Sequence, residues 1–527
     1  MGGDGWRTAR LVDVAQINPD SIGRGWPHTQ IHYVDISSVG EGQIQVPPQL
    51  LALADAPSRA KRLIRSGDTV LSTVRPNRRS MFFADQPGPD WVVSTGFAVL
   101  RPQVQMIAPR FLYACVFSQS FTEYLVSQEK GAAYPAVSPE DIGNAVIPLP
   151  PLKEQQAIAC ILGALDDKIE LNRTMNRTLE ATARAIFKSW FVDFDPVHWN
   201  SARRLANIPR SEPGKWFIYA IECEGGSHYI GFTDDLHRRF DEHCRGCGAD
   251  WTKAHPPVRL AYWEPVDSQA EAVAREQKLK SGSGREWLKA EIARNWTPRR
   301  PLPAGRQVKP EIAALFPDSF EPSELGEIPK GWRVDSLDGI ANYLNGLALQ
   351  KYPPKNAGTL PVIKIAQLRK GDSYGADLCS ANLPTDYIIQ DGDVLFSWSG
   401  SLEVEIWCGG AGALNQHLFK VTSHRFKKWF FFLWTLHHLN DFRLIAADKA
   451  TTMGHIQRKH LSDARVLIPS KPLMDSMDNL MDPLVERVVS CRLESRTLAA
   501  LRDTLLPKLI SGELRIPDAE RIAGRYL

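Results

Sequence analysis

Five side chains near the middle of the chain could together hydrolyse a phosphodiester bond. They are Tyr219, Tyr229, Arg239, His243 and Glu276. This reaction requires an activated water, positive charge beside the reacting phosphate and a stabilised leaving oxygen, and the set contains a candidate for each. Taken singly, the tyrosines are more readily explained as sheet-packing residues, and the arginine and glutamate as a surface pair.

The surrounding sequence predicts the elements that would position these side chains. Residues 216–221 and 228–233 have strand patterns and are separated by a Gly225-Gly226 turn, so they are expected to form a hairpin with one tyrosine on each strand. Asp234 is expected to cap a helix that carries the arginine and the histidine. A later helix at 269–280 would carry the glutamate.

Breaker-rich flanks separate this segment from the rest of the chain. Pro and Gly recur near both of its ends, which is typical of linkers, and a compact domain is therefore expected between them. The segment also contains the single Cys-x-x-Cys of the chain, Cys244 and Cys247, next to His243. Because no second pair follows at zinc-finger spacing, these cysteines are interpreted as loop thiols in preference to a zinc site.

The segment resembles the small single-domain branch of the GIY-YIG nuclease superfamily. The matching residues are Phe217-Ile218-Tyr219, with Phe in place of the first glycine, then Tyr229-Ile230-Gly231, Thr233, Leu236, Arg239, His243, Ala249, Trp251, Thr252, Pro257-Val258, Leu260, Glu271-Ala272, Arg275-Glu276, Lys278 and Lys280.

The resemblance implies a role for each of the five residues. Glu276 would hold one divalent cation, Mg²⁺ or a similar hard ion. Tyr219 would accept or relay the proton of the attacking water, and Tyr229 would orient that water. Arg239 would clamp the phosphate and His243 would assist. A tyrosine ordinarily titrates near pH 10, so it is a poor base unless a cation lowers its pKa.

The remainder of the chain contains an internal repeat. Gly5-Trp6-Arg7 returns as Gly331-Trp332-Arg333, and the Gly-Asp turn and strand at 66–72 return at 391–397. Each half then closes with an Ile-Pro step. A repeated unit fixes an architecture before any element is assigned, so two similar, strand-rich domains are expected.

Each half is followed by a long heptad pattern, which predicts a pair of helices. The expected seam positions are Ile158, Leu162, Leu165, Ile169, Asn172, Asn176, Leu179, Ala183, Ile186 and Trp190 in the first helix, and Leu473, Met477, Leu480, Leu484, Arg487, Cys491, Glu494, Leu498, Leu501 and Leu505 in the second. The polar seam residues would fix the register of the pair. The alternative, in which each helix packs only on its own domain, is disfavoured by the length of the 3.5-residue period.

This arrangement is similar to the specificity subunits of type I restriction-modification systems. The resemblance rests on the duplication and on Gly331-Trp332, residues 392–400, Leu414-Asn415-Gln416-His417 and residues 505–514. It implies two target-recognition domains that read a split site on double-stranded DNA. It also implies helices that act as a ruler and as a dock for methyltransferase and restriction subunits.

These patterns predict an α+β multidomain fold with two long, antiparallel coiled-coil helices. The expected boundaries are target-recognition domain 1 at 1–150, helix 1 at 151–197, a linker at 198–213, the GIY-YIG domain at 214–296, a linker at 297–324, target-recognition domain 2 at 325–470, helix 2 at 471–515 and a tail at 516–527.

Basic and polar residues near the repeated Gly-Asp turn are candidate DNA contacts. They are Arg62, Arg65, Arg75, Asn77, Arg78 and Arg79 in the first half, and Asn415, Gln416 and His417 in the second. Such residues can hold phosphates or reach base edges. A solvated basic face explains the arginines equally well, and hydrogen bonding within a turn or core explains the second group better than base reading.

The amino-acid composition limits the class of protein only broadly. The 527 residues, 43% hydrophobic and 23% charged, indicate several globular domains. A net charge of +3 permits binding to nucleic acid without establishing it. No apolar leader or membrane span is evident and the eight cysteines are scattered, so a cytosolic protein with reduced thiols is expected.

Three hypotheses follow for the whole chain. The leading one is a DNA specificity subunit with an active nuclease inserted between its halves. In the second, the insert is inert and acts as a spacer or an additional DNA contact. In the third, the insertion disrupts the ruler and leaves only the nuclease working.

Overall fold

The computed structural model describes residues 6–23, 25–131, 135–205, 208, 211, 214–294, 310–354, 358–448 and 454–526. The chain divides into two units, Met1–Asn176 with Ser490–Leu527, and Arg177–Val489. None of the helices in the described ranges combines the length and apolar character needed to cross a lipid bilayer.

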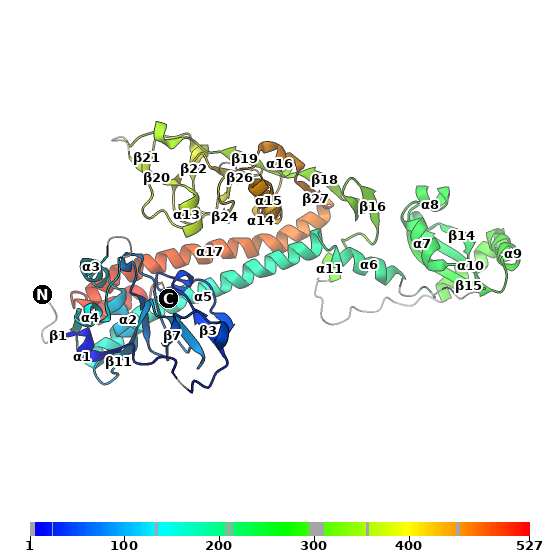
Figure 1. Cartoon of the computed structure of the whole chain (residues 1–527). Coiled ribbons are helices and arrows are strands. Elements are labelled where there is room, and N and C mark those ends of the chain that lie inside the picture. The colour runs from blue at the N-terminus through cyan, green and yellow to red at the C-terminus, as the bar shows by residue number, and fades with distance from the viewer. Residues whose placement is uncertain are drawn as a thin grey trace. The chain divides into compact units, whose positions relative to one another are not determined.

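The first half is built on two four-stranded sheets (Figure 1). One has the order β2 (Ala15–Ile17), β11 (Phe97–Pro102), β8 (Thr69–Ser72), β9 (Met81–Phe83), and the other the order β6 (Gln49–Ala52), β3 (Gln30–Val34), β10 (Trp91–Ser94), β7 (Ala60–Leu63). Short pairs join β1 (Arg7–Arg10) to β12 (Val146–Leu149) and β4 (Val39–Gly40) to β5 (Gln43–Ile44). The helices are α1 (Leu11–Val14), α2 (Pro109–Phe117), α3 (Gln119–Ser127) and α4 (Pro139–Gly143).

The second half repeats the order of both four-stranded sheets and the β1–β12 pair. Its sheets have the orders β19 (Asn342–Asn345), β26 (Leu418–Thr422), β23 (Val394–Ser397), β24 (Val404–Ile406), and β21 (Leu378–Ser380), β20 (Thr359–Ile363), β25 (Gly412–Leu414), β22 (Ile388–Ile389), while β18 (Arg333–Ser336) pairs with β27 (Arg465–Ile468). The helices are α12 (Leu337–Ile340), α13 (Ile365–Lys370), α14 (Lys428–His437), α15 (Leu439–Asp448) and α16 (Arg458–Asp463). Each half contains one parallel strand pair, β3 with β10 and β20 with β25. The repeat expected from the sequence is confirmed.

The repeated Gly-Asp turn has the same chemistry in both halves. Gly67 and Gly392 both have a φ of 90°, a conformation that favours glycine. The next residue closes the turn, because Asp68 accepts the Arg65 amide at 2.8 Å and Asp393 accepts the Gln390 amide at 2.7 Å. Each turn leads into a strand, β8 or β23, whose residues are all buried.

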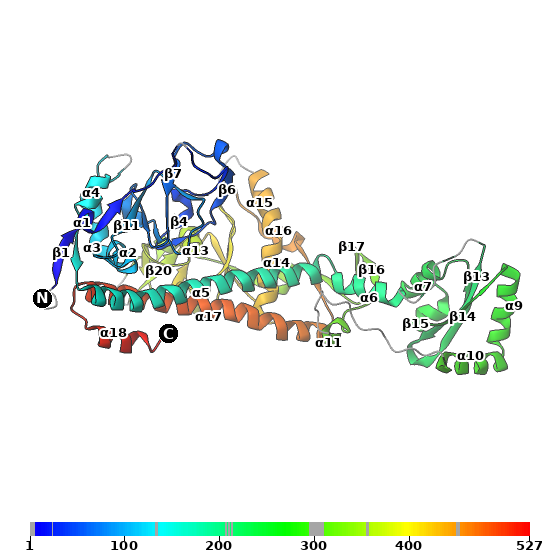
Figure 2. The same ribbon diagram turned by 90° about the horizontal axis from the view of Figure 1, so that it is seen from below.

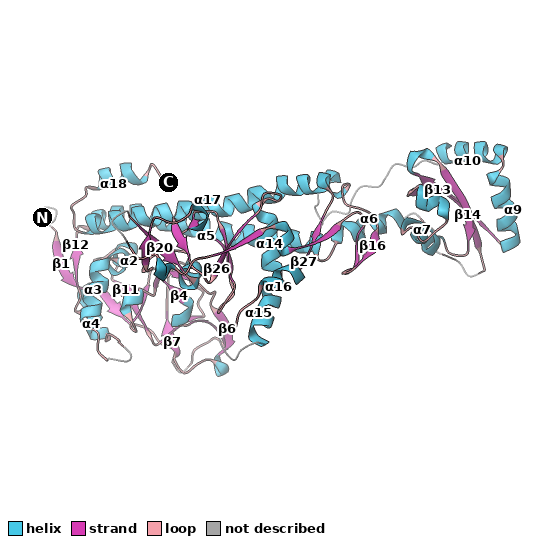
Figure 3. Ribbon diagram, turned by 90° about the horizontal axis from the view of Figure 1, so that it is seen from above, coloured by secondary structure: helices cyan, strands magenta, loops and turns pink. Residues whose placement is uncertain are grey.

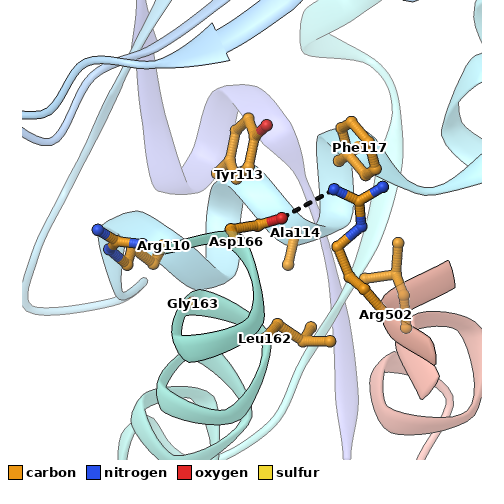
Figure 4. A pocket seen from close by; sticks show the side chains of 9 residues that line it. Arg110, Tyr113, Ala114, Phe117, Leu162, Gly163, Asp166 and Arg502 are labelled. Atoms are coloured by element: carbon orange, nitrogen blue, oxygen red, sulfur yellow. Dashed lines mark hydrogen bonds and ion pairs between the residues drawn. The ribbon is translucent and has the colours of Figure 1, made fainter. Parts of the chain in front are cut away.

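Each long helix, α5 (Leu152–Phe191) and α17 (Lys471–Ile510), contains 40 residues. In the unit that contains Met1–Asn176 and Ser490–Leu527, the two helices run antiparallel, since Asp166 bonds to Arg502 (Figure 4) and Asn172 to Glu494. Their apolar residues share one core cluster with α2. The helices therefore pair with each other and also pack on the first domain.

The expected seam is wrong in detail at several positions. Arg487 is exposed and Val488 is buried in its place, and Phe187 is buried instead of Ile186. An α-helix has 3.6 residues per turn, so a strict 3.5-residue pattern drifts by about 20° per heptad over a long helix. The buried position consequently moves by one residue. Asn172 and Glu494, both expected at the seam, do contact each other, at 2.9 Å.

The insertion forms its own α/β fold. A three-stranded antiparallel sheet has the order β14 (His228–Thr233), β13 (Trp216–Cys223), β15 (Pro257–Val266). Helix α7 (Leu236–Cys244) covers one face, and α9 (Gln269–Lys280) with α10 (Gly282–Arg294) covers the other (Figure 3). A short helix, α8 (Asp250–Ala254), follows α7. Asp235 caps α7 by accepting the Arg238 amide, so the expected cap at Asp234 is wrong by one residue.

Within the second unit, the residue segments that flank the insertion meet each other. Asn200, in α6 (Asp195–Leu205), donates to the carbonyl of Ala313 at 2.9 Å and to that of Phe316 at 3.0 Å. Ala313 ends α11 (Pro310–Ala313), and β16 (Phe320–Ser323) and β17 (Gly326–Pro329) follow as a hairpin. The segments expected as linkers are thus partly structured. We call these contacts between the residues before and after the insertion the neck.

The expected tail also contains structure. Helix α18 (Ile516–Ala523) buries Ala519 and Ala523 in the core cluster that contains α2 and the ends of the long helices (Figure 2). Pro517 in its first turn favours the start of the helix, and the two buried alanines allow it to pack closely.

Candidate nuclease site and candidate DNA contacts

Tyr219 lies at the centre of the candidate site. It points from β13 toward α7, and its side chain is 1% exposed. Its hydroxyl is 2.8 Å from His243 Nε2 and 3.4 Å from Arg239 Nε. Because Arg239 and His243 are four residues apart, α7 presents both side chains on the same face.

The glycine of the second motif allows the Tyr219 hydroxyl to reach this position. Gly231 is directly opposite Tyr219 in the β13–β14 register. A Cβ atom at residue 231 would lie 2.6 Å from the Tyr219 hydroxyl oxygen, which no side chain can occupy without displacing the tyrosine. Tyr229, from the same strand, places its ring centroid 4.8 Å from that of His243. The four side chains expected from β13, β14 and α7 therefore converge.

Glu276 approaches from α9. Its side chain is 15% exposed, and Oε1 accepts a hydrogen bond from Lys280 at 2.7 Å. Helix α9 packs on the face of the sheet opposite α7, and the contact that the structure gives the Glu276 carboxylate is the one with Lys280. Within the described ranges, no three His, Cys, Asp or Glu side chains gather as metal ligands. A single carboxylate suits Mg²⁺, which keeps most of its waters and shares substrate oxygens.

Burial shifts the pKa values of Tyr219 and His243 in opposite directions. It raises the pKa of Tyr219 well above its usual value, and the hydrogen bond from Arg239 offsets only part of that rise. It lowers the pKa of His243 to about 4, an effect to which the positive charge of Arg239 adds. At neutral pH the tyrosine therefore holds its proton, while the histidine is neutral and can accept one.

Arg239 is not free in this state. Its Nη1 bonds to Glu242 Oε2 at 2.7 Å, and the other oxygen of Glu242 bonds to Arg238 at 2.6 Å. A carboxylate and a phosphate use the same guanidinium donors. Glu242 is a functional neighbour that motif reasoning did not find, although its position three residues after Arg239 on a helix was a usable signal.

The departure from the motif, Phe217, belongs to the same core cluster as Tyr219. Phe217, which replaces the first glycine, is buried with Leu236 and Phe240 in the core beneath α7. Cys244 belongs to the same core, whereas Cys247 is exposed. These two thiols therefore do not point to a common place.

The candidate DNA contacts in the first half differ in how they are engaged. Arg79 bonds to Glu41 at 2.8 Å and lies over the Phe117 ring at 4.5 Å, and Arg65 pairs with Asp20 at 2.8 Å. Arg62 is half-buried, and burial lowers its pKa. Arg79 and Arg62 are thus engaged within the domain, whereas Arg65 is 69% exposed and makes a surface ion pair.

The loop between β8 and β9 presents the other candidates. Arg75 and Arg79 have φ values of 51° and 52°, and between them lies a 3₁₀ turn, Pro76–Arg78. Left-handed arginines are uncommon, and such strain concentrates at functional sites. Asn77 and Arg78, inside the turn, are exposed and make no side-chain bond to the residues that the structure describes.

The candidates in the second half bond among themselves. The side chain of Asn415 accepts the His417 amide at 3.2 Å. The imidazole of His417 lies 2.9 Å from Ser399 Oγ and 3.2 Å from the Gln416 side-chain nitrogen. The sequence predicted this kind of hydrogen bonding for these residues in preference to base reading.

Comparison with known proteins assigns both parts of the chain. Residues 3–181 and 329–474 match the family described as "Type I restriction modification DNA specificity domain". The chain belongs to this family. Residues 215–289 match the family described as "GIY-YIG catalytic domain", so this specificity protein contains a GIY-YIG domain between its two repeats.

Two curated relatives match different parts of the chain. The Type I restriction enzyme HindI specificity subunit of Haemophilus influenzae is 23% identical over 470 residues, which cover 87% of this chain and 89% of that protein. A UPF0213 protein of Staphylococcus saprophyticus is 40% identical over 75 residues, 14% of this chain and 92% of that protein. The solved type I restriction-modification S subunit from M. genitalium is 12% identical, with a TM-score of 0.44 over 96% of this chain and 97% of that one.

Proposed function

We propose that this specificity protein recognises a bipartite DNA site and that its GIY-YIG domain hydrolyses phosphodiester bonds with the help of a divalent cation. The observation that carries the nuclease proposal is the convergence of Tyr219, Arg239 and His243 around one hydroxyl group. The partners are double-stranded DNA and the methyltransferase and restriction subunits of a type I complex, in keeping with the family and with the name of the Haemophilus influenzae relative.

Each site residue has a task in this reaction. Tyr219 accepts or relays the proton of the attacking water, and Tyr229 orients that water. Arg239 exchanges Glu242 for the phosphate and stabilises the charge that develops on it. His243 assists Tyr219. The neutral His243 can take a proton, and because burial raises the pKa of Tyr219, a relay through its hydroxyl is favoured over a free phenolate.

Glu276 is the residue that would hold the cation. A cation held by its carboxylate would supply Lewis-acid stabilisation of the negative charge that develops in the reaction. Lys280 occupies one oxygen of this carboxylate, and its cationic side chain has to give way to the metal. Glu276 is mostly buried, which restricts competing water.

Plasmid nicking tests the nuclease proposal. We expect the purified full chain to nick supercoiled plasmid in Mg²⁺ and not in EDTA. Glu276→Ala and Tyr219→Phe should slow nicking by about 10²–10⁴-fold, because they remove the metal ligand and the proton relay. Glu286→Ala, a charge change at an exposed position of α10, is the matched control and should nick normally. No nicking by the wild type, or equal nicking by all variants, would show that the insertion is inert.

The neck bears on whether the insertion disrupts the specificity scaffold. Helix α5 is continuous to Phe191 and ends before the insertion begins. The Asn200 contacts close the gap that the insertion opens. Both observations support a working scaffold that carries an added domain, and co-purification with methyltransferase subunits tests it.

We further propose that Asn77 and Arg78 contact DNA. Both are exposed, and the loop that carries them is fixed at each end by a left-handed arginine. A rigid loop that presents an amide and a guanidinium can read base edges or hold phosphates at a low entropic cost. Arg79 supports this loop from inside.

Neighbouring arginines provide a matched test. We expect Arg78→Ala or Asn77→Ala to weaken duplex DNA binding by about 1–3 kcal/mol without a change in thermal stability. Arg79→Ala should lower the melting temperature instead, since it removes the Glu41 pair and the contact with Phe117. Unchanged affinity in Arg78→Ala and Asn77→Ala, measured over a salt series, would exclude this loop from the interface.

A further inference from the structure

Three hydrogen bonds run in series from α8 to the centre of the candidate site. Thr252 Oγ1 is 2.8 Å from the carbonyl oxygen of Ala249 and 2.8 Å from His243 Nδ1. His243 Nε2 is in turn 2.8 Å from the Tyr219 hydroxyl. Thr252 and His243 are 2% and 0% exposed, so water does not compete for these bonds.

The donor and the acceptor in each of these hydrogen bonds follow from the carbonyl group of Ala249 at the end of the series. A carbonyl oxygen can only accept, so the single hydroxyl proton of Thr252 is donated to Ala249, the usual arrangement for a helical threonine. The Thr252 oxygen then accepts from His243, which places the imidazole proton on Nδ1. Nε2 of His243 then carries no proton and must accept the hydrogen bond from the Tyr219 hydroxyl.

The other contacts of Tyr219 agree with this direction. Arg239 Nε can only donate, and it donates to the Tyr219 oxygen. The hydroxyl proton of Tyr219 is therefore directed to His243. With the opposite tautomer, two donors would meet at the Tyr219 oxygen, and its own proton would have no acceptor among the residues that the structure describes.

The protein also holds the imidazole in place from the side. Gly248 lies against it, and a Cβ atom at residue 248 would lie 2.3 Å from Nδ1. The Tyr229 ring packs nearby, with centroids 4.8 Å apart. The ring plane is thus set by packing, and what remains to be set is the position of its proton.

We propose that Thr252 is a positioning residue that keeps the proton of His243 on Nδ1, so that Nε2 can take the proton of Tyr219. The proposal rests on the nuclease function. As the water oxygen bonds to phosphorus, its proton moves to the Tyr219 oxygen and the proton of Tyr219 moves to Nε2. The P–O bond to the leaving group breaks with its electron pair on oxygen. That oxygen takes a proton from solvent, and the imidazolium returns one to solvent.

Two substitutions separate the hydroxyl from the shape of Thr252. Thr252→Val keeps the shape and removes the hydroxyl, whereas Thr252→Ser keeps the hydroxyl and removes a methyl group. We expect Thr252→Val to lower kcat for nicking by about 10–100-fold, in the range for loss of the partner that orients a functional histidine, with KM unchanged. Thr252→Ser should nick within about twofold of wild type. The reverse order, with an active valine variant and an impaired serine variant, would establish a packing role and overturn the proposal.

A second measurement does not depend on nicking. In the full chain labelled with ¹⁵N-histidine, the ring nitrogens of His243 report their proton directly, and a His243→Gln spectrum assigns them. We expect the Nδ1–H form in the wild type and in Thr252→Ser, and a mixture of tautomers in Thr252→Val. A wild-type spectrum with the proton on Nε2 would overturn the proposal. Absence of nicking with the expected Nδ1–H form would instead refute the nuclease function and leave the role of Thr252 in setting the tautomer in place.

Discussion

Replacing Arg502 with methionine should destabilise the unit that contains both termini by about 2–3 kcal/mol. Arg502 reaches from α17 to Asp166 on α5, with 2.8 Å between Nη1 and Oδ1, and its guanidinium lies 4.5 Å from the centre of the Phe117 ring (Figure 4). Methionine keeps most of the side-chain volume but leaves the carboxylate without this partner. Breaking a buried pair from one side costs roughly 3–5 kcal/mol. The expected loss is smaller because Asp166 is 27% exposed.

A double variant distinguishes charge from packing. Asp166→Asn combined with Arg502→Met removes both charges, and we expect it to recover most of the stability lost in Arg502→Met. Thermal melting of the full chain, followed by circular dichroism, gives the comparison. If the double variant melts no higher than Arg502→Met, the contact with Phe117, and not the ion pair, holds α2 on the helix pair.

The second large effect is expected at Arg239. Arg239→Ala should slow plasmid nicking by about 10²–10³-fold, the cost of losing one donor to the charge that develops in a transition state. The same change removes the hydrogen bond to the Tyr219 hydroxyl. Binding of the full chain to its DNA site should not change, because the GIY-YIG domain lies outside the two specificity repeats.

Arg238→Ala is the matched control for that variant. Arg238 lies on the same helix and shares Glu242 with Arg239, but it makes no contact with Tyr219. We expect Arg238→Ala to nick within a few-fold of wild type. If Arg238→Ala and Arg239→Ala slow nicking equally, loss of the shared interaction with Glu242 causes the defect, and Arg239 is not the phosphate clamp.

Duplication and motif spacing made much of this fold predictable. The Gly-Asp turns at Gly67 and Gly392 require a left-handed residue followed by a capping carboxylate, and both requirements are visible in the sequence. The order of Tyr219, Tyr229, Arg239 and His243 likewise placed one hairpin and one helix correctly. The correct predictions were those that depend on local backbone conformation and motif order, which few other residues satisfy.

Features set by tertiary packing were not predictable in the same way. The buried position moved from Arg487 to Val488 because the real helix turns every 3.6 residues. That Arg79 supports a loop from inside while Arg78 faces outward depends on Phe117, a distant residue in sequence. The sequence equally offered no sign of the direction of the bond between Thr252 and His243. Such choices depend on neighbours brought together by the fold.

The neck also has a consequence for the way this chain folds. Asn200 contacts Ala313 and Phe316 directly. For the specificity scaffold, the insertion is therefore equivalent to a loop whose two ends are in contact. The entropy lost in closing a loop grows only with the logarithm of its length, by about 0.6 kcal/mol for each doubling. The roughly 110 residues between Asn200 and Ala313 correspond to about five doublings of a four-residue loop, a cost of about 3 kcal/mol. This cost is smaller than the stability of a typical domain, about 5–15 kcal/mol, so a recognition protein can accept an inserted domain at this position and still fold.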